Sequence, residues 1–519
     1  MVLILMMQEK YRKNTEAEWP AVSPSNNITR EFSCEVEQLK PMKTMPGVDD
    51  RSERRALGRR LRKVASRSSH GSWGPSEDRR DPIEILREQD ELRVSDLVPI
   101  RYGRMAASPF AFFRGAAAVM AQDLSETPVT GITVQTCGDA HLLNFGMYAT
   151  PERRLVFDLN DFDETMPGPW EWDVKRLAAS FEIAGRSNGY APGVVSTGVL
   201  EVARSYGEGV RALTRLSTLD EWYFRVDIDT VLAEIDSVRR GDRGAGSSFE
   251  LALLGLDATR DRRSIERARR QIEKARGRTN ERAVNRLTEI GDDGALRIID
   301  NPPLVVPLAL DDQERARFDK AFAEYRETLV RDRRHLLDRF KFVALGRKVV
   351  GVGSVGTRAL FAVFVDDGGF PLLLQFKQAS MSVLEPYLGP SEFETHGERV
   401  VEGQRLMQSA SDLFLGWTRD EEVEIDYYFR QLRDMKGSFD LAFMNPPGFV
   451  HYARLCGVTL ARAHVRSGDG DAIAGYLGES GVFDRSIASF VSAYADQVVL
   501  DHASLIKEID NGHIEVRFA

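Results

Sequence analysis

A chain of 519 residues is long enough for two or more lobes with buried cores, so its size permits a large enzyme. Its 70 Lys and Arg residues against 79 Asp and Glu residues give a net charge of −9, which argues against a general nucleic-acid or anionic-membrane binder. Cys34, Cys137 and Cys456 have no C-x-x-C spacing, so neither a disulfide framework nor a cysteine zinc site is supported. A reducing, cytoplasmic location is the simplest expectation.

Residues 1–55 mix prolines, polar residues and charges without periodicity, and we predict a mobile tail. The tail opens on the apolar run MVLILMM, which is far shorter than the ~20 residues of a membrane span and lacks the flanks of a signal peptide. We therefore expect no export signal and no membrane partner. The basic run RSERRALGRRLRKVASRSSHGSW follows, and it favours a solvated arm or exposed helix over an anion-binding role.

From Asp81 the pattern becomes helical in DPIEILREQDELRVSDLVPI. The next run, SPFAFFRGAAAVMAQDL, offers a serine N-cap, an early proline and an apolar face, and also predicts a helix. Arg114 lies within this apolar run, where a buried ion pair is favoured over a contact with phosphate or substrate. Beyond it, GITVQTC predicts a strand, and NFGMYA and RRLVFDL around the turn ATPE predict a β-hairpin.

After the hairpin, EWDVKRLAASFEIAGRS is amphipathic and opens a region that we predict to be helical to about Asp338. Within it, the run from Glu250 to Arg282 alternates Arg with Glu, which is typical of an exposed helix. At Lys348 the pattern changes to KVVGVGSVGTRALFAVFVDDGGFPLLLQFKQAS. Three apolar runs joined by a glycine turn and by DDGG predict a small antiparallel sheet.

The remaining segments are predicted to be a helix in HGERVVEGQRLMQSASDLF, a strand with its connector in DYYFRQLRDMKGS, and further helices. The predicted organisation has four parts. A mobile tail covers residues 1–55, a helical large lobe covers 56–338, a small nucleotide-binding lobe covers 339–436, and C-terminal helices over 437–519 complete the large lobe.

Two polar clusters flank the predicted hairpin. Asp139 and Asn144 have the D-x-x-x-x-N spacing of a kinase catalytic loop, in which the carboxylate accepts a proton and the amide binds magnesium. Asp161 and Asp163 form D-F-D after the hairpin, where kinases place the metal-binding aspartate of D-F-G. We favour these catalytic and metal roles over a capped turn and an acidic surface loop, because burying such groups unpaired costs roughly several kcal/mol. For His141, a catalytic role and a structural role are equally consistent with the sequence.

A second group of candidates is a glycine-rich run that consists of Gly351, Val352, Gly353, Ser354, Val355 and Gly356. The G-x-G-x-x-G pattern alone is weak evidence, but here it joins strand to strand, whereas the dinucleotide fingerprint leads into a helix. Lys377 ends the third apolar run, where kinases place the lysine that contacts the nucleotide phosphates. We expect this lysine to pair with a glutamate of the next helix, Glu402 by preference and Glu398 otherwise.

The blocks GDAHLLNFG and FDLNDFDETMPGPWEWD resemble the H-G-D-x-H-x-x-N and I-D-W/F motifs of aminoglycoside and choline phosphotransferases, in the protein-kinase-like superfamily. More closely, RMAASPFAFFRG, GDAHLLNFG, KVVGVGSVGTR and RVVEGQRLMQ resemble a bacterial family classed as a domain of unknown function, over roughly Leu57 to the C-terminus. The resemblance implies that Asp139 is the catalytic base, that Asn144 and Asp161 bind magnesium, and that Asp173 braces the loop. The glycines of the glycine-rich run and Lys377 would hold nucleotide phosphates.

The chain departs from these families in two ways. Cys137 stands where they have a histidine, and the glycine-rich run and Lys377 follow the catalytic loop by some two hundred residues instead of preceding it. We therefore predict an α+β, protein-kinase-like two-lobed fold that is circularly permuted, a change that chains tolerate where their termini lie close together. A separation above ~15 Å between Lys377 and Asp161 would contradict this fold, because one nucleotide must reach both residues.

These features predict a magnesium-dependent phosphotransferase that moves the γ-phosphoryl group of ATP to a hydroxyl, of a small molecule rather than of a protein. Two alternatives remain open: nucleotidyl (AMP) transfer in the same pocket, and a nucleotide-binding regulatory protein with little turnover. The expected ligands are ATP, Mg²⁺ and a small-molecule hydroxyl acceptor. The sequence indicates no nucleic-acid partner and names no protein partner.

Other residues carry weaker expectations. Arg430, Arg433 and Lys436 follow the predicted strand DYYFRQ and are expected in an exposed connector. Trp170 and Trp172 are expected in the core. The histidines have no H-E-x-x-H or other paired-ligand spacing, so a zinc enzyme has little support.

Overall fold

The structure is a computed structural model that describes residues 50–240, 242, 249–255, 262–292, 294–349, 351, 353, 355–432, 434–441 and 444–518. The chain divides into two compact units, Met1–Asp50 and Arg51–Ala519, and the architecture below is that of the second unit. Residues 1–49 of the predicted tail, including Cys34, lie outside the described residues. The last residues of the predicted tail, 50–55, belong to a helix that covers Asp50–Leu61. None of the described helices combines the length and apolarity needed to cross a membrane.

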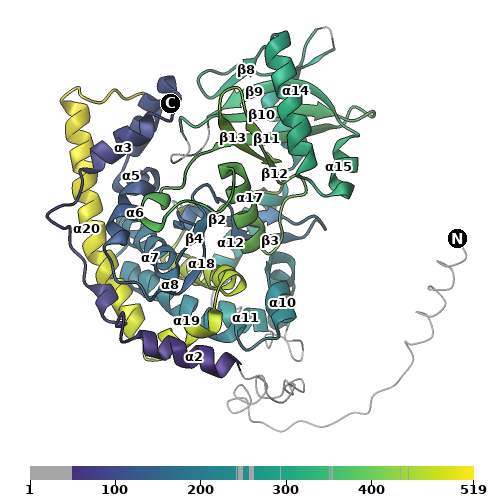
Figure 1. The fold of residues 1–519 in the computed structure, drawn as a ribbon. Helices are drawn as coiled ribbons and strands as arrows, with labels where there is room; N and C mark the ends of the chain where they lie inside the picture. Colours follow the sequence, from purple (N-terminus) through teal and green to yellow (C-terminus); the bar gives the residue numbers. More distant parts are fainter. Residues whose placement is uncertain are drawn as a thin grey trace, which may run out of the picture. The chain divides into compact units, whose positions relative to one another are not determined.

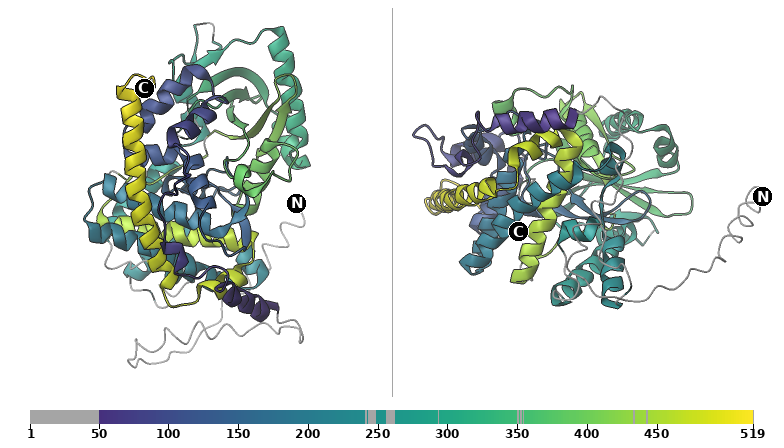
Figure 2. Two further views of the ribbon diagram at one scale, coloured as in Figure 1. Left: turned by 60° about the vertical axis from the view of Figure 1, so that its left-hand side comes forward. Right: turned by 90° about the horizontal axis from the view of Figure 1, so that it is seen from below.

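Helices make up most of this unit and enclose one extensive apolar core. They are α2 Asp50–Leu61, α3 Pro82–Asp90, α4 Val98–Met105, α5 Pro109–Gly115, α6 Ala117–Ser125, α7 Trp170–Ser187, α8 Pro192–Leu213, α9 Thr218–Tyr223, α10 Ile228–Arg240, α11 Phe249–Leu254, α12 Arg262–Arg276, α16 Glu385–Leu388, α17 His396–Met407, α18 Pro446–Ser467, α19 Gly470–Leu477 and α20 Val482–Asp510. The long helix α20 packs on α7 and α8, and α18 lies along α8 (Figures 1 and 2). Trp170 and Trp172 are buried in this core, as predicted.

Local sequence explains where several elements begin. The hydroxyl of Ser108 accepts a hydrogen bond from the N–H of Ala111, and Pro109 opens α5. The predicted helix breaks at Ala116, so α5 and α6 are separate. The predicted strand and hairpin are confirmed: β1 pairs with β4, and β2 pairs with β3 across a turn in which Arg153 has a φ of +66°. A short strand, β5, pairs with β3. The bounds of these strands are β1 Thr133–Thr136, β2 Phe145–Ala149, β3 Leu155–Leu159, β4 Met166–Pro169 and β5 Val226–Asp227.

The small antiparallel sheet is also confirmed. It has six strands in the order β12-β13-β11-β10-β9-β8 (Figure 1). Their bounds are β8 Val305–Leu308, β9 Lys341–Lys348, β10 Ala359–Val365, β11 Pro371–Ala379, β12 Gly416–Asp420 and β13 Ile425–Gln431. The glycine-rich run connects β9 to β10, and Lys377 lies on β11, next to Tyr428 of β13. The sheet therefore presents its lysine beside the strand that leads to the predicted connector.

The sheet and its covering helices begin well before residue 339, the predicted start of the small lobe. Three helices, α13 Asn280–Leu287, α14 Asp312–Glu327 and α15 Arg331–Leu337, and the hairpin of β6 Thr288–Ile290 and β7 Leu296–Ile298 precede that point. Aromatic side chains of α14 pack on one face, where Tyr325 stacks on Phe429 with ring centroids 4.0 Å apart, and Val284 of α13 packs on the other. Strands this short leave almost no periodic signal, so a uniformly helical pattern was expected here.

Two arginines of the basic run, Arg62 and Arg67, are docked on a neighbouring helix. Arg62 donates to the carbonyls of Gly475 and Tyr476 at 2.7 and 2.8 Å, and Arg67 donates to that of Leu477 at 2.7 Å. These carbonyls end α19, where the helix leaves its last acceptors unpaired and where positive charge is favourable. The guanidinium groups thus complete the C-terminus of α19. The expected exposed helix is present as α2, in which Gly58 is the buried residue, whereas Arg62 and Arg67 are neither solvated nor part of an anion site.

Replacing Arg62 by Ala is expected to lower the free energy of unfolding by about 1 kcal/mol, because two carbonyls lose their donors. Urea denaturation of the full chain measures this loss. Arg59→Ala is the matched control, since Arg59 is an exposed arginine of the same basic run, three residues before Arg62. Equal losses in the two variants would contradict the docking role of Arg62.

Candidate functional site

The loop between β1 and β2 is held by the first turn of α7. Asp173 accepts hydrogen bonds from the N–H groups of Cys137 and Gly138, at 2.6 and 3.0 Å. Gly138 has a φ of +77°, and a Cβ at this position would lie 2.3 Å from the carbonyl oxygen of Glu164. Glycine is therefore required here, and the backbone that precedes Asp139 is fixed. The brace that the resemblance assigns to Asp173 matches this geometry.

Cys137 stands where the similar phosphotransferase motif has a histidine, and its thiol makes a hydrogen bond of its own. Its Sγ lies 3.2 Å from the carbonyl oxygen of Asp161. Burial raises the pKa of the Cys137 thiol well above its ordinary value, so the thiol stays protonated. It donates a hydrogen bond to this carbonyl. The contact ties the loop between β1 and β2 to the segment that follows the hairpin.

Asp139 forms an ion pair that sequence reasoning missed. Arg176 of α7 donates to its Oδ1 from Nε at 2.7 Å, and the Asp139 side chain is 18% exposed. Burial raises the pKa of Asp139 to about 6, although the Arg176 guanidinium opposes this rise. Arg176 lies three residues after Asp173, and this i, i+3 spacing on one helix face was the signal that could have identified it.

His141 and Asn144 shape the loop itself. The Nδ1 of His141 accepts a hydrogen bond from the N–H of Leu143 at 3.1 Å, and its Nε2 lies 3.9 Å from an Asp139 oxygen. Burial lowers the pKa of His141 well below its ordinary value, so the ring is neutral. Asn144 donates from Nδ2 to the Asp139 carbonyl at 2.5 Å, which leaves its Oδ1 as the end of the amide that can coordinate a cation.

Lys377 meets the acidic segment directly after β3. It forms an ion pair with Asp163, and its Nζ lies 4.0 Å from Oδ1 of Asp161. Burial alone would lower the pKa of Lys377, but the Asp163 carboxylate raises it above its ordinary value. Oδ1 of Asp161 is buried and accepts no hydrogen bond from any residue that the structure describes. An unpaired buried carboxylate oxygen is costly, and a bound cation would satisfy it.

Asp163 has partners that differ from those predicted. Lys377 binds its Oδ2, and the Tyr428 hydroxyl donates to its Oδ1 at 2.8 Å. Burial alone would raise the pKa of Asp163, but Lys377 holds it below its ordinary value. Both carboxylate oxygens are thus engaged by protein groups, which favours a positioning role for Asp163 over the predicted role of a metal ligand.

The predicted pairing of Lys377 with Glu402 is not formed. Glu402 pairs with Arg405 one turn further along α17, with N and O atoms 2.6 Å apart. The helix instead turns Arg399 toward the site, where this buried guanidinium donates to the carbonyls of Asp163, Thr165 and Ser380 at 2.6–2.9 Å. Glu398, the other candidate, lies in the first turn of α17 and donates its N–H to the Thr395 cap. The rotation of α17 about its axis decides which side chains face the site, and the sequence sets that rotation only loosely.

The glycine-rich run is anchored to the helical part of the unit. Arg93 donates to the carbonyls of Gly353 and Val355 at 3.1 and 2.5 Å, and the N–H of Val94 donates to that of Gly356 at 2.8 Å. Val352 and Ser354, both predicted to bind nucleotide, lie outside the described residues. Gly351 and Gly353 of this run line the same cavity as Asp139.

One cavity of about 420 Å³ unites these segments. The predicted residues that line it are Asp139, His141, Asn144, Asp161, Asp163, Gly351, Gly353 and Lys377. The lining also includes five further cationic side chains, Arg93, Arg114, Lys348, Arg430 and Lys436, and the carboxylate of Glu164. The cavity therefore combines a small acidic cluster with a surplus of positive charge, which suits an anion that carries a cation with it.

Three of these cations differ from the expectation that the sequence favoured for them. Arg114 has its Nε buried without a hydrogen-bond partner among the described residues, and it faces Asp139 and Asp161 instead of closing an ion pair. Arg430 and Lys436 line the cavity rather than an exposed connector, because the segment after β13 folds back and pairs Gly437 with Met147 of the hairpin. Burial, together with Arg430, lowers the pKa of Lys436 to about 7. Arg433 lies outside the described residues.

The cavity offers only a few protein ligands for a magnesium ion. In the part of the chain that the structure describes, no three His, Cys, Asp or Glu side chains are grouped to hold a metal ion. A magnesium ion that arrives on nucleotide phosphates needs only one or two protein ligands, because phosphate oxygens and water complete its octahedron. Asn144 Oδ1 and the unpaired Asp161 Oδ1 are the donors that meet this need.

The comparisons with known proteins identify a family for this chain, and the description of that family names no activity. A family model described as "Uncharacterized protein conserved in bacteria (DUF2252)" matches residues 93–508, a range that holds nearly the whole cavity lining. No curated protein matches the chain, and no solved structure does. Because the match covers most of the chain, this protein belongs to the bacterial family DUF2252.

Proposed function

We propose that the protein is a magnesium-dependent phosphotransferase that moves the γ-phosphoryl group of ATP to a hydroxyl. One observation carries the proposal. Two segments some two hundred residues apart line one cavity: the first supplies Asp139, Asn144 and Asp161, and the second supplies Gly351, Gly353 and Lys377. Phosphoryl transfer needs these groups together: a proton acceptor, oxygen ligands for magnesium and a cationic clamp for phosphates.

Each residue has a defined task in this proposal. Asp139, held by Arg176, accepts the proton of the acceptor hydroxyl, and a pKa of about 6 suits a base that works near neutrality. Asn144 and Asp161 would hold Mg²⁺, which offsets charge on the phosphates when bound. Lys377, placed by Asp163 and Tyr428, would contact the nucleotide phosphates. Arg114, Arg430 and Lys436 add positive charge that favours a polyphosphate.

The fold proposed for this chemistry is a circularly permuted protein-kinase-like arrangement. Three features support it: a hairpin between the catalytic loop and Asp161, a glycine turn within an antiparallel sheet, and a Lys377 that lies 4.0 Å from Asp161. This separation is well inside the ~15 Å that a shared nucleotide allows. The resemblance of GDAHLLNFG to small-molecule phosphotransferases favours a small hydroxyl compound over a protein as acceptor.

Two parallel incubations with magnesium and ATP test the reaction, one with label on the α phosphate and one on the γ phosphate, against a mixed extract of small metabolites. Transfer of the γ label alone is the expected result. Transfer of the α label would replace the proposal by nucleotidyl transfer, and binding of ATP without transfer of either label would leave a regulatory protein. A protein that does not bind ATP at all would refute all three.

Turnover is expected to rise with pH through about 6, because only the carboxylate form of Asp139 accepts a proton. Arg176→Gln removes the cation that opposes this raised pKa, so the midpoint should move to higher pH. Turnover measured between about pH 5 and pH 8 tests both statements. Arg186→Gln, an exposed change on the same helix, serves as control and should leave the midpoint in place. A midpoint that does not respond to Arg176→Gln would contradict the role of Asp139.

A further inference from the structure

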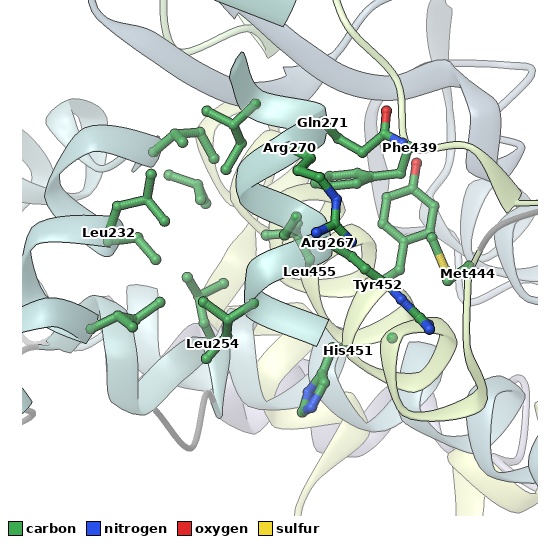
Figure 3. A pocket seen from close by; sticks show the side chains of 18 of the residues that line it. Leu232, Leu254, Arg267, Arg270, Gln271, Phe439, Met444, His451, Tyr452 and Leu455 are labelled. Carbon is green, nitrogen blue, oxygen red and sulfur yellow. The ribbon is translucent and has the colours of Figure 1, made fainter. Parts of the chain in front are cut away.

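A second cavity, the apolar cavity, lies between α10, α12 and α18 and has a volume of about 550 Å³ (Figure 3). None of its described lining residues belongs to the cavity that holds Asp139. Most of its wall is apolar, with side chains that include Val231, Ile235, Leu254, Ile272, Phe439 and Tyr452. Protein interiors are packed almost as densely as organic crystals, so an apolar space of this size is unusual unless a ligand fills it.

The polar side chains of the apolar cavity include two arginines and one acidic residue, beside the neutral amides of Gln271 and Asn445 and the ring of His451. Arg267 and Arg270, three residues apart on α12, are exposed residues of the cavity lining, and Figure 3 labels both side chains beside the cavity. Neither arginine forms an ion pair with another described residue, whereas the nearby Arg269 is paired with Asp236. Asp440 is the acidic residue among the described lining. Two guanidinium groups beside an apolar chamber match a ligand with an apolar body and one anionic head.

The inner wall of the apolar cavity is joined to the catalytic loop. The Tyr452 hydroxyl donates to the carbonyls of Leu142 and Phe145, at 2.7 and 3.2 Å. Its ring packs against Phe439 and against Phe157 of β3, with centroids 5.3 and 6.0 Å apart. A ligand that touches Tyr452 and Phe439 therefore contacts the side chains that support the loop and hairpin carrying Asn144 and Asp161.

We infer that the apolar cavity binds a small amphipathic anion, an apolar chain with one anionic head held by Arg267 and Arg270, and that this ligand acts on the catalytic loop through Tyr452. The binding step is independent of the proposed phosphotransfer. The action of the ligand on the loop rests on the proposed phosphotransfer function. Binding and action are therefore tested separately.

Binding is tested on the full chain with cis-parinarate, a carboxylate whose fluorescence rises in an apolar environment. Saturable binding of one probe per chain is expected, and its uncharged methyl ester should bind about 10-fold more weakly. Ala268→Phe places a ring in the cavity and should abolish binding of both probes. Arg270→Gln should weaken the carboxylate about 10-fold and leave the ester unchanged.

Lys274→Gln is the matched control, because it removes one exposed positive charge from the same helix outside the cavity lining. It should leave both probes unaffected, and thermal melting shows whether each variant is folded. Three results would overturn the site: no saturable binding, unchanged binding in a folded Ala268→Phe variant, or equal losses in Arg270→Gln and Lys274→Gln.

The action on the loop is measured as the dissociation constant of ATP with and without saturating cis-parinarate. A shift of severalfold is expected in the natural chain. Tyr452→Phe keeps the ring in the cavity wall but removes the two hydrogen bonds to the loop, so the probe should still bind while the shift disappears. If saturating cis-parinarate leaves the dissociation constant of ATP unchanged, the action on the loop is refuted. If the chain binds the probe but no ATP, the proposed function is refuted and the binding site for the probe stands.

Discussion

Asp139→Asn is expected to lower turnover by about 10²–10⁴-fold while the affinity for ATP stays near that of the natural chain. The amide cannot accept the hydroxyl proton, yet it keeps an oxygen for the Arg176 guanidinium, which donates to Oδ1 at 2.7 Å. The loop is also held by bonds that the change leaves in place, from Asp173 to the N–H groups of Cys137 and Gly138. The fold and the nucleotide site should therefore survive.

Labelled-phosphate transfer and a direct ATP titration measure the two quantities on the same preparation. Asp123→Asn is the matched control, because Asp123 is a buried carboxylate paired with Arg79 outside the cavity. It should cost stability without removing transfer. Full activity in Asp139→Asn would refute the assignment of the base, and a comparable loss in Asp123→Asn would attribute the effect to general destabilisation.

Lys377→Met is expected to have two separable effects. It removes the cation assigned to the nucleotide phosphates, so ATP affinity and turnover should both fall by at least about 10-fold. It also leaves the Asp163 carboxylate without its partner, and loss of one member of a buried pair costs about 3 kcal/mol of stability.

The double variant Lys377→Met with Asp163→Asn distinguishes these effects. Removing the stranded carboxylate should restore much of the free energy of unfolding, measured in urea, while ATP binding and transfer stay low. Recovery of activity together with stability would mean that Lys377 serves the fold and does not contact the nucleotide. A Lys377→Met chain of unchanged stability would contradict the ion pair itself.

Local patterns in the sequence were sufficient for much of the fold and for half of the site. The hairpin was predictable because strand-forming runs flank a short turn, and the spacing of Asp139 and Asn144 is a property of five consecutive peptide bonds. The glycine turn between two apolar runs predicted the strands around it in the same way. These features depend on neighbours along the chain, so one sequence contains the information that determines them.

Contacts between segments that are distant in the sequence were harder to predict from local patterns. Burial of Arg430 and Lys436 depends on a connector that folds back to pair Gly437 with Met147, which no local pattern announces. Docking of the basic run depends on the carbonyls that end α19, some four hundred residues later in the chain. Charge runs are usually solvated, and only the presence of an unpaired acceptor surface changes that outcome.

The sequence by itself determined which chemical groups this protein has and their order along the chain: an aspartate and an amide on one loop, acids after a hairpin, and a glycine turn with a lysine beyond it. The tertiary structure alone decided how these groups are paired. It joined Lys377 to Asp163 instead of Glu402, turned Arg399 inward and left Asp161 Oδ1 without a hydrogen bond from any described residue. Helix rotation and the packing of distant segments set these contacts, because the energies that select them come from burial across the whole unit.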